Sequence, residues 1–198
     1  METARVIRRL LSFSAAVGLA ALLAACETTP AYPPTPPPPP PPPPTPAEEF
    51  AWSTVRGANT LVVNVAYEPA AGQAWTCSGL TEALMPETSY SRGRIMALYG
   101  SIERALQTVG QVRTRSAANP GADYGQFVKT APCDAQNTAT FAALPDGAYF
   151  IIAQVRPARP PGAAAEMVVM QRVELSGGQA VRITLPQAGG PPRPGGAR

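Results

Sequence analysis

The sequence predicts a mainly β protein: an antiparallel β-sandwich with one inserted amphipathic helix, preceded by a signal peptide and a polyproline linker. Three observations support this fold class. Short apolar segments recur between turn sequences across residues 47–185, and several of them alternate with period two. One segment has the period of a helix instead. A charged and then apolar leader, followed by a proline run, occupies the first 46 residues.

The leader is typical of a signal peptide. Arg5, Arg8 and Arg9 form a basic start, and residues 10–24 are apolar or small. This apolar run is shorter than the roughly 20 residues that a membrane-spanning helix needs. We therefore expect residues 1–25 to be removed on export, although a short uncleaved membrane anchor is the alternative.

The end of the leader, "LAAC" at residues 23–26, resembles the lipobox of bacterial lipoproteins. The resemblance implies that Cys26 is lipidated on its sulfur and becomes the acylated first residue of the mature chain. Several acyl chains, palmitate among them, make a durable membrane anchor. Glu27 follows where an Asp favours inner-membrane retention in enteric bacteria, which favours the outer membrane here.

Residues 26–46 are predicted to be the lipidated cysteine and a linker. Residues 30–46 contain 13 prolines in 17 positions, which favours an extended polyproline II spacer. Recognition of the prolines as a ligand is the alternative. At the other end, the Pro/Gly-rich residues 186–198 are expected to be disordered.

The β-sandwich domain is predicted to span residues 47–185. A separate segment, residues 91–109, repeats apolar residues at helical spacing and is predicted to be an amphipathic helix packed on the sheet, or else a helix that binds a partner. The strands expected from alternation and β propensity are residues 60–67, 138–144, 148–155, 167–175 and 180–185, with weaker candidates at 74–79, 109–115 and 125–130.

The turn "PDG" at residues 145–147 predicts a hairpin between residues 138–144 and 148–155. This stretch, with Phe141, Leu144 and Tyr149, resembles the hairpin of carboxypeptidase-regulatory-like, transthyretin-like β-sandwich domains. The resemblance covers 18 residues and implies a small sandwich that is generally not catalytic. No functional residue is carried over from it.

Cysteine usage fits an exported protein. With Cys26 lipidated, Cys77 and Cys133 remain, and disulfides persist in an oxidising compartment. A bridge that closes 57 residues would stabilise the fold by about 4 kcal/mol in the chain-entropy model. Two separate reduced thiols are the alternative.

Several classes of chemistry are disfavoured. The chain contains no histidine, so Ser-His-Asp and Cys-His catalysis and His-based zinc sites are excluded. The formal net charge is only +3, and three of the 16 basic residues lie in the leader, which argues against nucleic acid as a partner. The sequence predicts no catalytic residue, no cofactor site and no metal site.

The remaining candidates are weak. Glu82 and Glu87 are interpreted as solvated loop acids rather than a catalytic pair, and the spacing of Asp123 and Asp134 matches no standard calcium loop. Trp52, directly after the linker, is the better candidate for an exposed contact with a partner. A second tryptophan, Trp75, is expected in the core beside Cys77.

The sequence thus favours a non-enzymatic, lipid-anchored cell-envelope protein, placed in the outer membrane and facing the periplasm or the cell surface. Its domain would be presented on a proline stalk to an unidentified envelope protein or polysaccharide. The alternative is an accessory lipoprotein of a secretion, pilus or surface-attachment machine, and an enzyme is less favoured.

Replacement of Cys26 tests the anchor. We expect Cys26→Ser to move the protein out of the membrane fraction, because serine offers no thiol for the diacylglycerol group. Immunoblotting of carbonate-extracted membranes and of the soluble fraction measures this. A Cys26→Ser protein that still resists carbonate extraction would contradict lipid anchoring.

Overall fold

The computed structural model describes residues 44–70, 73–121, 123–158 and 166–186. The predicted signal peptide, Cys26, most of the linker and nearly all of the C-terminal tail lie outside these ranges. Nine strands and three α-helices form the folded domain. The described helices include none that is long and apolar enough to cross a bilayer.

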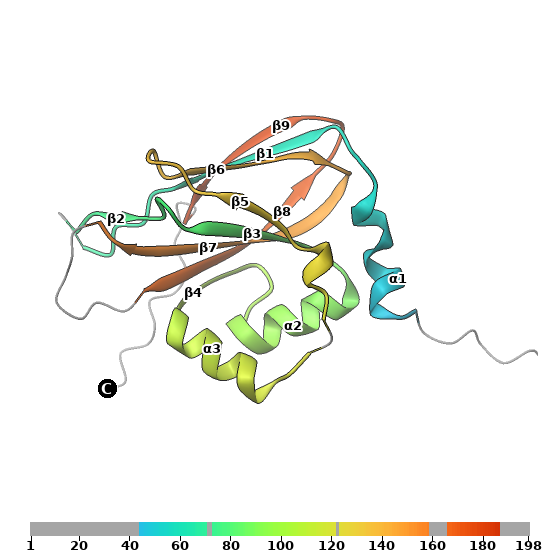
Figure 1. Cartoon of the computed structure of the whole chain (residues 1–198), viewed down its shortest axis with the longest axis horizontal. Coiled ribbons are helices and arrows are strands. Elements are labelled where there is room, and N and C mark those ends of the chain that lie inside the picture. Colours follow the sequence, from blue (N-terminus) through green and yellow to red (C-terminus); the bar gives the residue numbers. More distant parts are fainter. Residues whose placement is uncertain (1–43, 71–72, 122, 159–165, 187–198) are drawn as a thin grey trace, which may run out of the picture. The chain divides into compact units, whose positions relative to one another are not determined.

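Two sheets pack face to face, as a β-sandwich requires (Figure 1). In the smaller sheet, β1 (Asn59–Val65) lies between β6 (Thr138–Leu144) and β9 (Ala180–Leu185). The β1–β6 pair is antiparallel, whereas β1 and β9 run parallel. The larger sheet has the order β4-β8-β7-β3-β5, and β2 pairs with the end of β7.

All neighbours in the larger sheet are antiparallel. Its strands are β2 (Trp75–Thr76), β3 (Thr81–Pro86), β4 (Arg104–Thr108), β5 (Lys129–Pro132), β7 (Gly147–Pro157) and β8 (Met167–Leu175).

The larger sheet is apolar on both faces because each face meets a different layer. Along β7, Tyr149 and Ile151 point into the core between the sheets, while Phe150 points the other way. That second face is covered by α2 (Ser89–Tyr99) and α3 (Val109–Ala118), which lie below the larger sheet in Figure 1. The period-two geometry of a strand therefore turns the unbroken apolar run of β7 into two separate cores.

The helical layer differs from the single helix predicted over residues 91–109. Helix α2 ends at Gly100, whose φ of 75° is the left-handed conformation that glycine adopts readily. Strand β4 follows, and a capping box between Thr108 and Gln111 begins α3. Residues 109–115, a weak strand candidate, are therefore helical, and Leu106 packs on the core between the sheets.

The chain enters the domain through α1 (Pro46–Phe50) and the short 3-10 helix Ala51–Thr54 (η1). Thr45 caps α1 in a capping box with Glu48, so the first helix includes Pro46, which the sequence assigned to the linker. The ring of Phe50 is fully buried and stacks on Phe127 with centroids 4.9 Å apart. A second 3-10 helix, Gly125–Phe127 (η2), precedes β5.

The predicted hairpin at residues 138–155 is wrong in its pairing, although both strands exist. Strand β6 pairs with β1 in the smaller sheet, and β7 pairs with β3 and β8 in the larger one. The turn at residues 145–147 therefore carries the chain from one sheet to the other. Leu144 and Tyr149 on either side of it both fill the core between the sheets, and the Tyr149 hydroxyl donates to the Pro145 carbonyl at 2.9 Å.

The Asn59 side chain links this turn between the sheets to a second such connection, the loop between β8 and β9. Its Nδ2 donates to the Leu144 carbonyl at 3.1 Å and to Asp146 Oδ1 at 2.8 Å, and its Oδ1 accepts from the Gln179 backbone amide at 3.0 Å. Gln179 belongs to the loop that leads from β8 in the larger sheet to β9 in the smaller one. The Asn59 side chain is fully buried, and its bond to the Leu144 carbonyl is made away from water, whereas its bonds to Asp146 and Gln179 lie near the surface.

Substitution of Asn59 tests its structural importance. We expect Asn59→Ala to lower the free energy of unfolding by about 2–4 kcal/mol, because the buried Leu144 carbonyl loses its side-chain donor and the two loops lose the amide that links them. Urea denaturation followed by circular dichroism measures the change. Asn64→Ala on the same strand is the matched control and should cost less than about 1 kcal/mol. Equal effects of the two substitutions would contradict the role assigned to Asn59.

Candidate functional site

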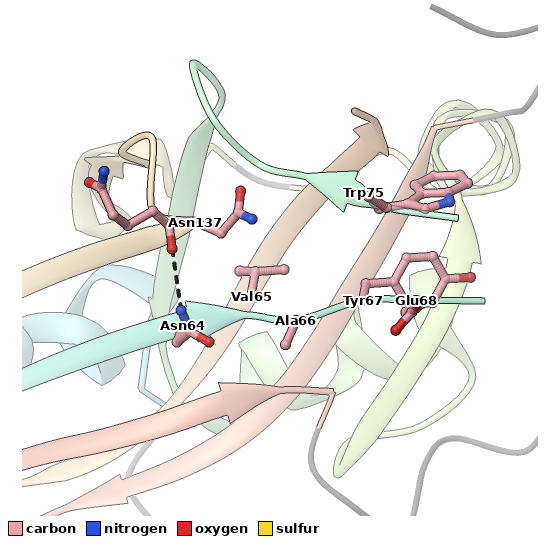
Figure 2. Close-up of a pocket in the computed structure, with 9 residues that line it drawn as sticks. Asn64, Val65, Ala66, Tyr67, Glu68, Trp75 and Asn137 are labelled. Carbon is pink, nitrogen blue, oxygen red and sulfur yellow. Dashed lines mark hydrogen bonds between the residues drawn. The ribbon is translucent and has the colours of Figure 1, made fainter. Parts of the chain in front are cut away.

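A pocket of roughly 360 Å³ opens where β1 and β2 end, beside the turn that precedes β6 (Figure 2). Tyr67 and Trp75 form its aromatic side, and their ring centroids lie 5.2 Å apart with an angle of 84° between the ring planes. The complete lining is Asn64, Val65, Ala66, Tyr67, Glu68, Ala74, Trp75, Gln136 and Asn137.

The aromatic pair is placed by two different strands. Tyr67 lies two residues beyond the end of β1, on the face that Leu61, Val63 and Val65 occupy, because side chains alternate along an extended chain. Trp75 belongs to β2, where it pairs with Pro157 at the end of β7. Both rings are half-buried against the core between the sheets, and burial raises the pKa of the Tyr67 hydroxyl. Tyr67 is therefore a neutral hydrogen-bonding group at neutral pH.

Asn137 provides the best-positioned polar group of the pocket. Its φ of 57° is in the left-handed region that asparagine tolerates. The side-chain Oδ1 accepts from the Thr76 hydroxyl at 2.5 Å and from the Cys77 backbone amide at 3.2 Å. Because Oδ1 is engaged in this way, the orientation of the amide is fixed and Nδ2 is its group that remains to donate to a ligand.

Asn64 stands next to Asn137 at the inner end of the pocket (Figure 2). Its Nδ2 donates to the Gln136 carbonyl and to the Thr138 hydroxyl, each at 3.4 Å. Its Oδ1 is then the acceptor that this amide offers. The pocket thus combines an aromatic pair with a fixed donor and a neighbouring acceptor, an arrangement typical of small-molecule sites.

The predicted disulfide is confirmed. Cys77 and Cys133 are bonded, their Cα atoms lie 5.7 Å apart, and both residues are buried. The bridge lies directly behind the pocket, because Asn137 Oδ1 accepts from the amide of Cys77. It links the segment after β2 to the segment after β5, and the alternative of two separate reduced thiols does not hold in this structure.

Glu82 and Glu87 are not the solvated loop acids that the sequence suggested. They begin and follow β3, a central strand that was not predicted because its two acids and Pro86 resemble a loop. Glu87 Oε2 forms an ion pair with Arg172 Nε at 2.6 Å, and Glu87 Oε1 pairs with Arg92. Glu82 is fully buried in the core beside the disulfide instead.

Burial governs the protonation of Glu82. Its Oε2 accepts from the Gln154 backbone amide at 2.9 Å, which favours the charged form. Loss of hydration is the larger effect and raises the pKa of this carboxyl to about 7. The carboxyl is therefore largely neutral below pH 6, in contrast to an exposed glutamate.

The other sequence candidates have local structural contacts. Trp52 is half-buried and packs on Tyr149 with centroids 5.4 Å apart, so it supports the core. Contact between Trp52 and a partner stays a prediction. Asp123 and Asp134 each accept hydrogen bonds from backbone amides of their own turns. Trp75, which the sequence analysis placed in the core, lines the pocket. Tyr67 and Asn137 line it too, and the sequence analysis did not name either of them.

Comparisons with known proteins found similar solved structures but no family. No protein-family model matches the sequence, and no curated protein matches it. One similar solved structure is a protein of Pseudomonas aeruginosa described as a "putative carbohydrate binding protein", with 22% identity and a TM-score of 0.48, covering 72% of this chain and 98% of that one.

Another is GBS52, the minor pilin of Streptococcus agalactiae, with 19% identity and a TM-score of 0.33. That match covers 64% of this chain and 49% of the pilin chain.

The buried acid predicts an unusual pH dependence of stability. The folded pKa of Glu82 is about 7, and the ordinary value is 4.5. The folded state therefore holds its proton more tightly, and this contribution is complete below pH 4.5 and is lost as the pH rises to 7. We expect the free energy of unfolding to fall by about 3 kcal/mol across this window.

Glu82→Gln should remove this fall, since glutamine can still accept from the Gln154 amide but does not titrate. Urea denaturation at a series of pH values from 4.5 to 8 measures the effect. The exposed Glu103→Gln is the control and should leave the profile unchanged. A Glu82→Gln profile as steep as that of the unchanged chain would contradict the prediction.

Proposed function

We propose that this protein is a non-enzymatic, lipid-anchored protein of the cell envelope whose β-sandwich domain binds a carbohydrate in the Tyr67–Trp75 pocket. The observation that carries the proposal is the composition of the pocket, in which two half-buried aromatic rings face fixed side-chain amides. The lipobox-like end of the leader and the proline run support the anchor and the stalk.

The chemistry of the pocket suits a sugar. A pyranose ring has an apolar face of C–H groups and an edge of hydroxyls that both donate and accept. Tyr67 and Trp75 offer apolar surface together with a hydroxyl and an indole N–H. Asn137 offers a donor at a fixed position, and Asn64 offers an acceptor. Such a pocket would hold a ligand by stacking and by hydrogen bonds to neutral side chains, beside the carboxylate of Glu68.

The cell-envelope setting fits this ligand class. A semi-rigid stalk of prolines keeps the domain away from the lipid surface, at ~3.1 Å per residue. A domain held in this way reaches polysaccharide in the periplasm or at the cell surface. Placement in the outer membrane rests on Glu27 after the lipidated Cys26.

Loss of the stacking ring tests the proposal. We expect the purified chain to bind a subset of bacterial oligosaccharides on a glycan array, and Trp75→Ala to weaken this binding about tenfold or more, because a stacked aromatic contact contributes on the order of 1 kcal/mol beyond its buried area. Trp75→Phe should retain part of the affinity.

Met96→Ala is the matched control, because Met96 is an exposed apolar side chain of α2, in the helical layer rather than at the pocket. Its binding should equal that of the unchanged chain. The proposal fails if the unchanged chain binds no glycan, or if Trp75→Ala binds the same glycans with equal affinity.

A further inference from the structure

Three potential metal ligands meet in the interior of the sandwich. The sulfurs of Cys77 and Cys133 and a carboxylate oxygen of Glu82 lie within 4.8 Å of one another, and all three residues are buried. They come from three separate segments: one follows β2, one lies in β3 and one follows β5. The fold therefore assembles this cluster from residues that are far apart in the sequence.

Glu82 is the unusual member of the cluster. Its side chain is fully buried, and its Oε2 accepts from the Gln154 amide. In the part of the chain that the structure describes, Oε1 of Glu82 is the buried side-chain oxygen that has no hydrogen-bond partner. An unpaired polar atom in a core destabilises the fold, and the sulfurs of a disulfide have no hydrogen to donate to it. The disulfide form thus leaves one carboxylate oxygen unsatisfied.

We propose that in the dithiol form of the chain, before the disulfide closes, Cys77, Cys133 and Glu82 bind one thiophilic divalent cation of the zinc class. Zinc binds thiolates at about 2.3 Å and carboxylates at about 2.0–2.2 Å, with tetrahedral geometry. Such a site requires its ligand atoms to lie on the order of 3.5 Å apart. In the disulfide form the two sulfurs are bonded and a Glu82 carboxylate oxygen lies within 4.8 Å of both, so the dithiol form reaches this spacing when the sulfurs separate and the three side chains turn toward a common centre.

The chemistry balances without a redox partner. Cys77 and Cys133 are synthesised as thiols, so the dithiol form needs no reductant. Cation binding releases the two thiol protons and the proton of the Glu82 carboxyl, and no electrons are transferred. Water completes the coordination. The cation and the disulfide exclude each other, because oxidation to the disulfide removes both thiolates, passes two electrons to a thiol oxidant and frees the cation.

Cobalt provides a direct test, since thiolate-bound Co²⁺ absorbs in the near-ultraviolet and visible range. The full chain carrying Cys26→Ser is purified in detergent and reduced anaerobically with a phosphine, and its two free thiols are verified by labelling. Titration with Co²⁺ should saturate at one equivalent with a thiolate charge-transfer band, and Zn²⁺ should abolish that band by displacement.

The carboxylate is tested separately. Glu82→Gln should weaken Co²⁺ binding at least tenfold, because it removes one of three anionic ligands, while the exposed Glu103→Gln should bind as the unchanged chain does. Circular dichroism with and without Zn²⁺ covers the case in which the reduced chain is unfolded, and Zn²⁺ should then restore the folded spectrum.

Two results would overturn the proposal. One is a reduced chain with two verified thiols that neither binds Co²⁺ stoichiometrically nor refolds with Zn²⁺. The other is a Glu82→Gln chain that binds Co²⁺ as tightly as the unchanged chain. Since the readouts are absorption and folding rather than glycan binding, they are independent of the function proposed for the Tyr67–Trp75 pocket.

Discussion

Asn59 holds together the two loops through which the chain passes between the sheets. A β-sandwich needs such connections between its sheets. In each connection, backbone amides and carbonyls lack the hydrogen-bond partners that a neighbouring strand would provide. Asn59 offers both a donor and an acceptor from one buried amide, so it can satisfy the Leu144 carbonyl in one loop and the Gln179 amide in the other. Asp146 reinforces the arrangement by accepting from Asn59 and from the Gly177 amide, and these bonds lower its pKa. These contacts tie the start of β1 to the loops that lead into β7 and β9.

The strands that the sequence predicted correctly share one property: side chains on the same face of the strand have similar burial along its length. Strand β1 alternates buried and half-buried residues over its full length, and β6 and β9 were found by the same pattern. The pairing of β6 with β7 was mispredicted because a Pro-Asp-Gly turn has the same local appearance whether it joins neighbouring strands or carries the chain between sheets. Only the contacts of Asn59 and Tyr149, which are long-range or depend on packing, distinguish the two cases.

Sequence reasoning missed Glu82, the most important polar residue of the interior, and Asn137, that of the pocket. It missed them for opposite reasons. Glu82 carries the residue type of a surface position, and its burial depends on β3 lying between β5 and β7, which no local pattern reveals. Asn137 lies in a polar turn where asparagine is expected for its backbone conformation alone. Its additional role becomes visible once the segment around Thr76 and Cys77 is placed against the turn, and the disulfide provides that placement. The Cys77–Cys133 disulfide thus lies against both the pocket residue Asn137 and the buried acid Glu82.

The location of the pocket on β1 has a mechanical consequence. The predicted proline stalk precedes α1, which in turn precedes β1 (Figure 1). Tyr67 of the pocket follows the other end of the same strand. Tension between a membrane anchor and a captured polymer would therefore run along β1. This strand is bonded to β6, and the pocket also includes Asn137 directly before β6, so the part of the load that enters through Asn137 acts in shear on the β1–β6 ladder. Hydrogen bonds loaded in shear share the force and resist it together, whereas bonds loaded at one end open in sequence. If the proposed anchor and ligand are both engaged, the β1–β6 ladder is therefore the part of the domain that bears tension.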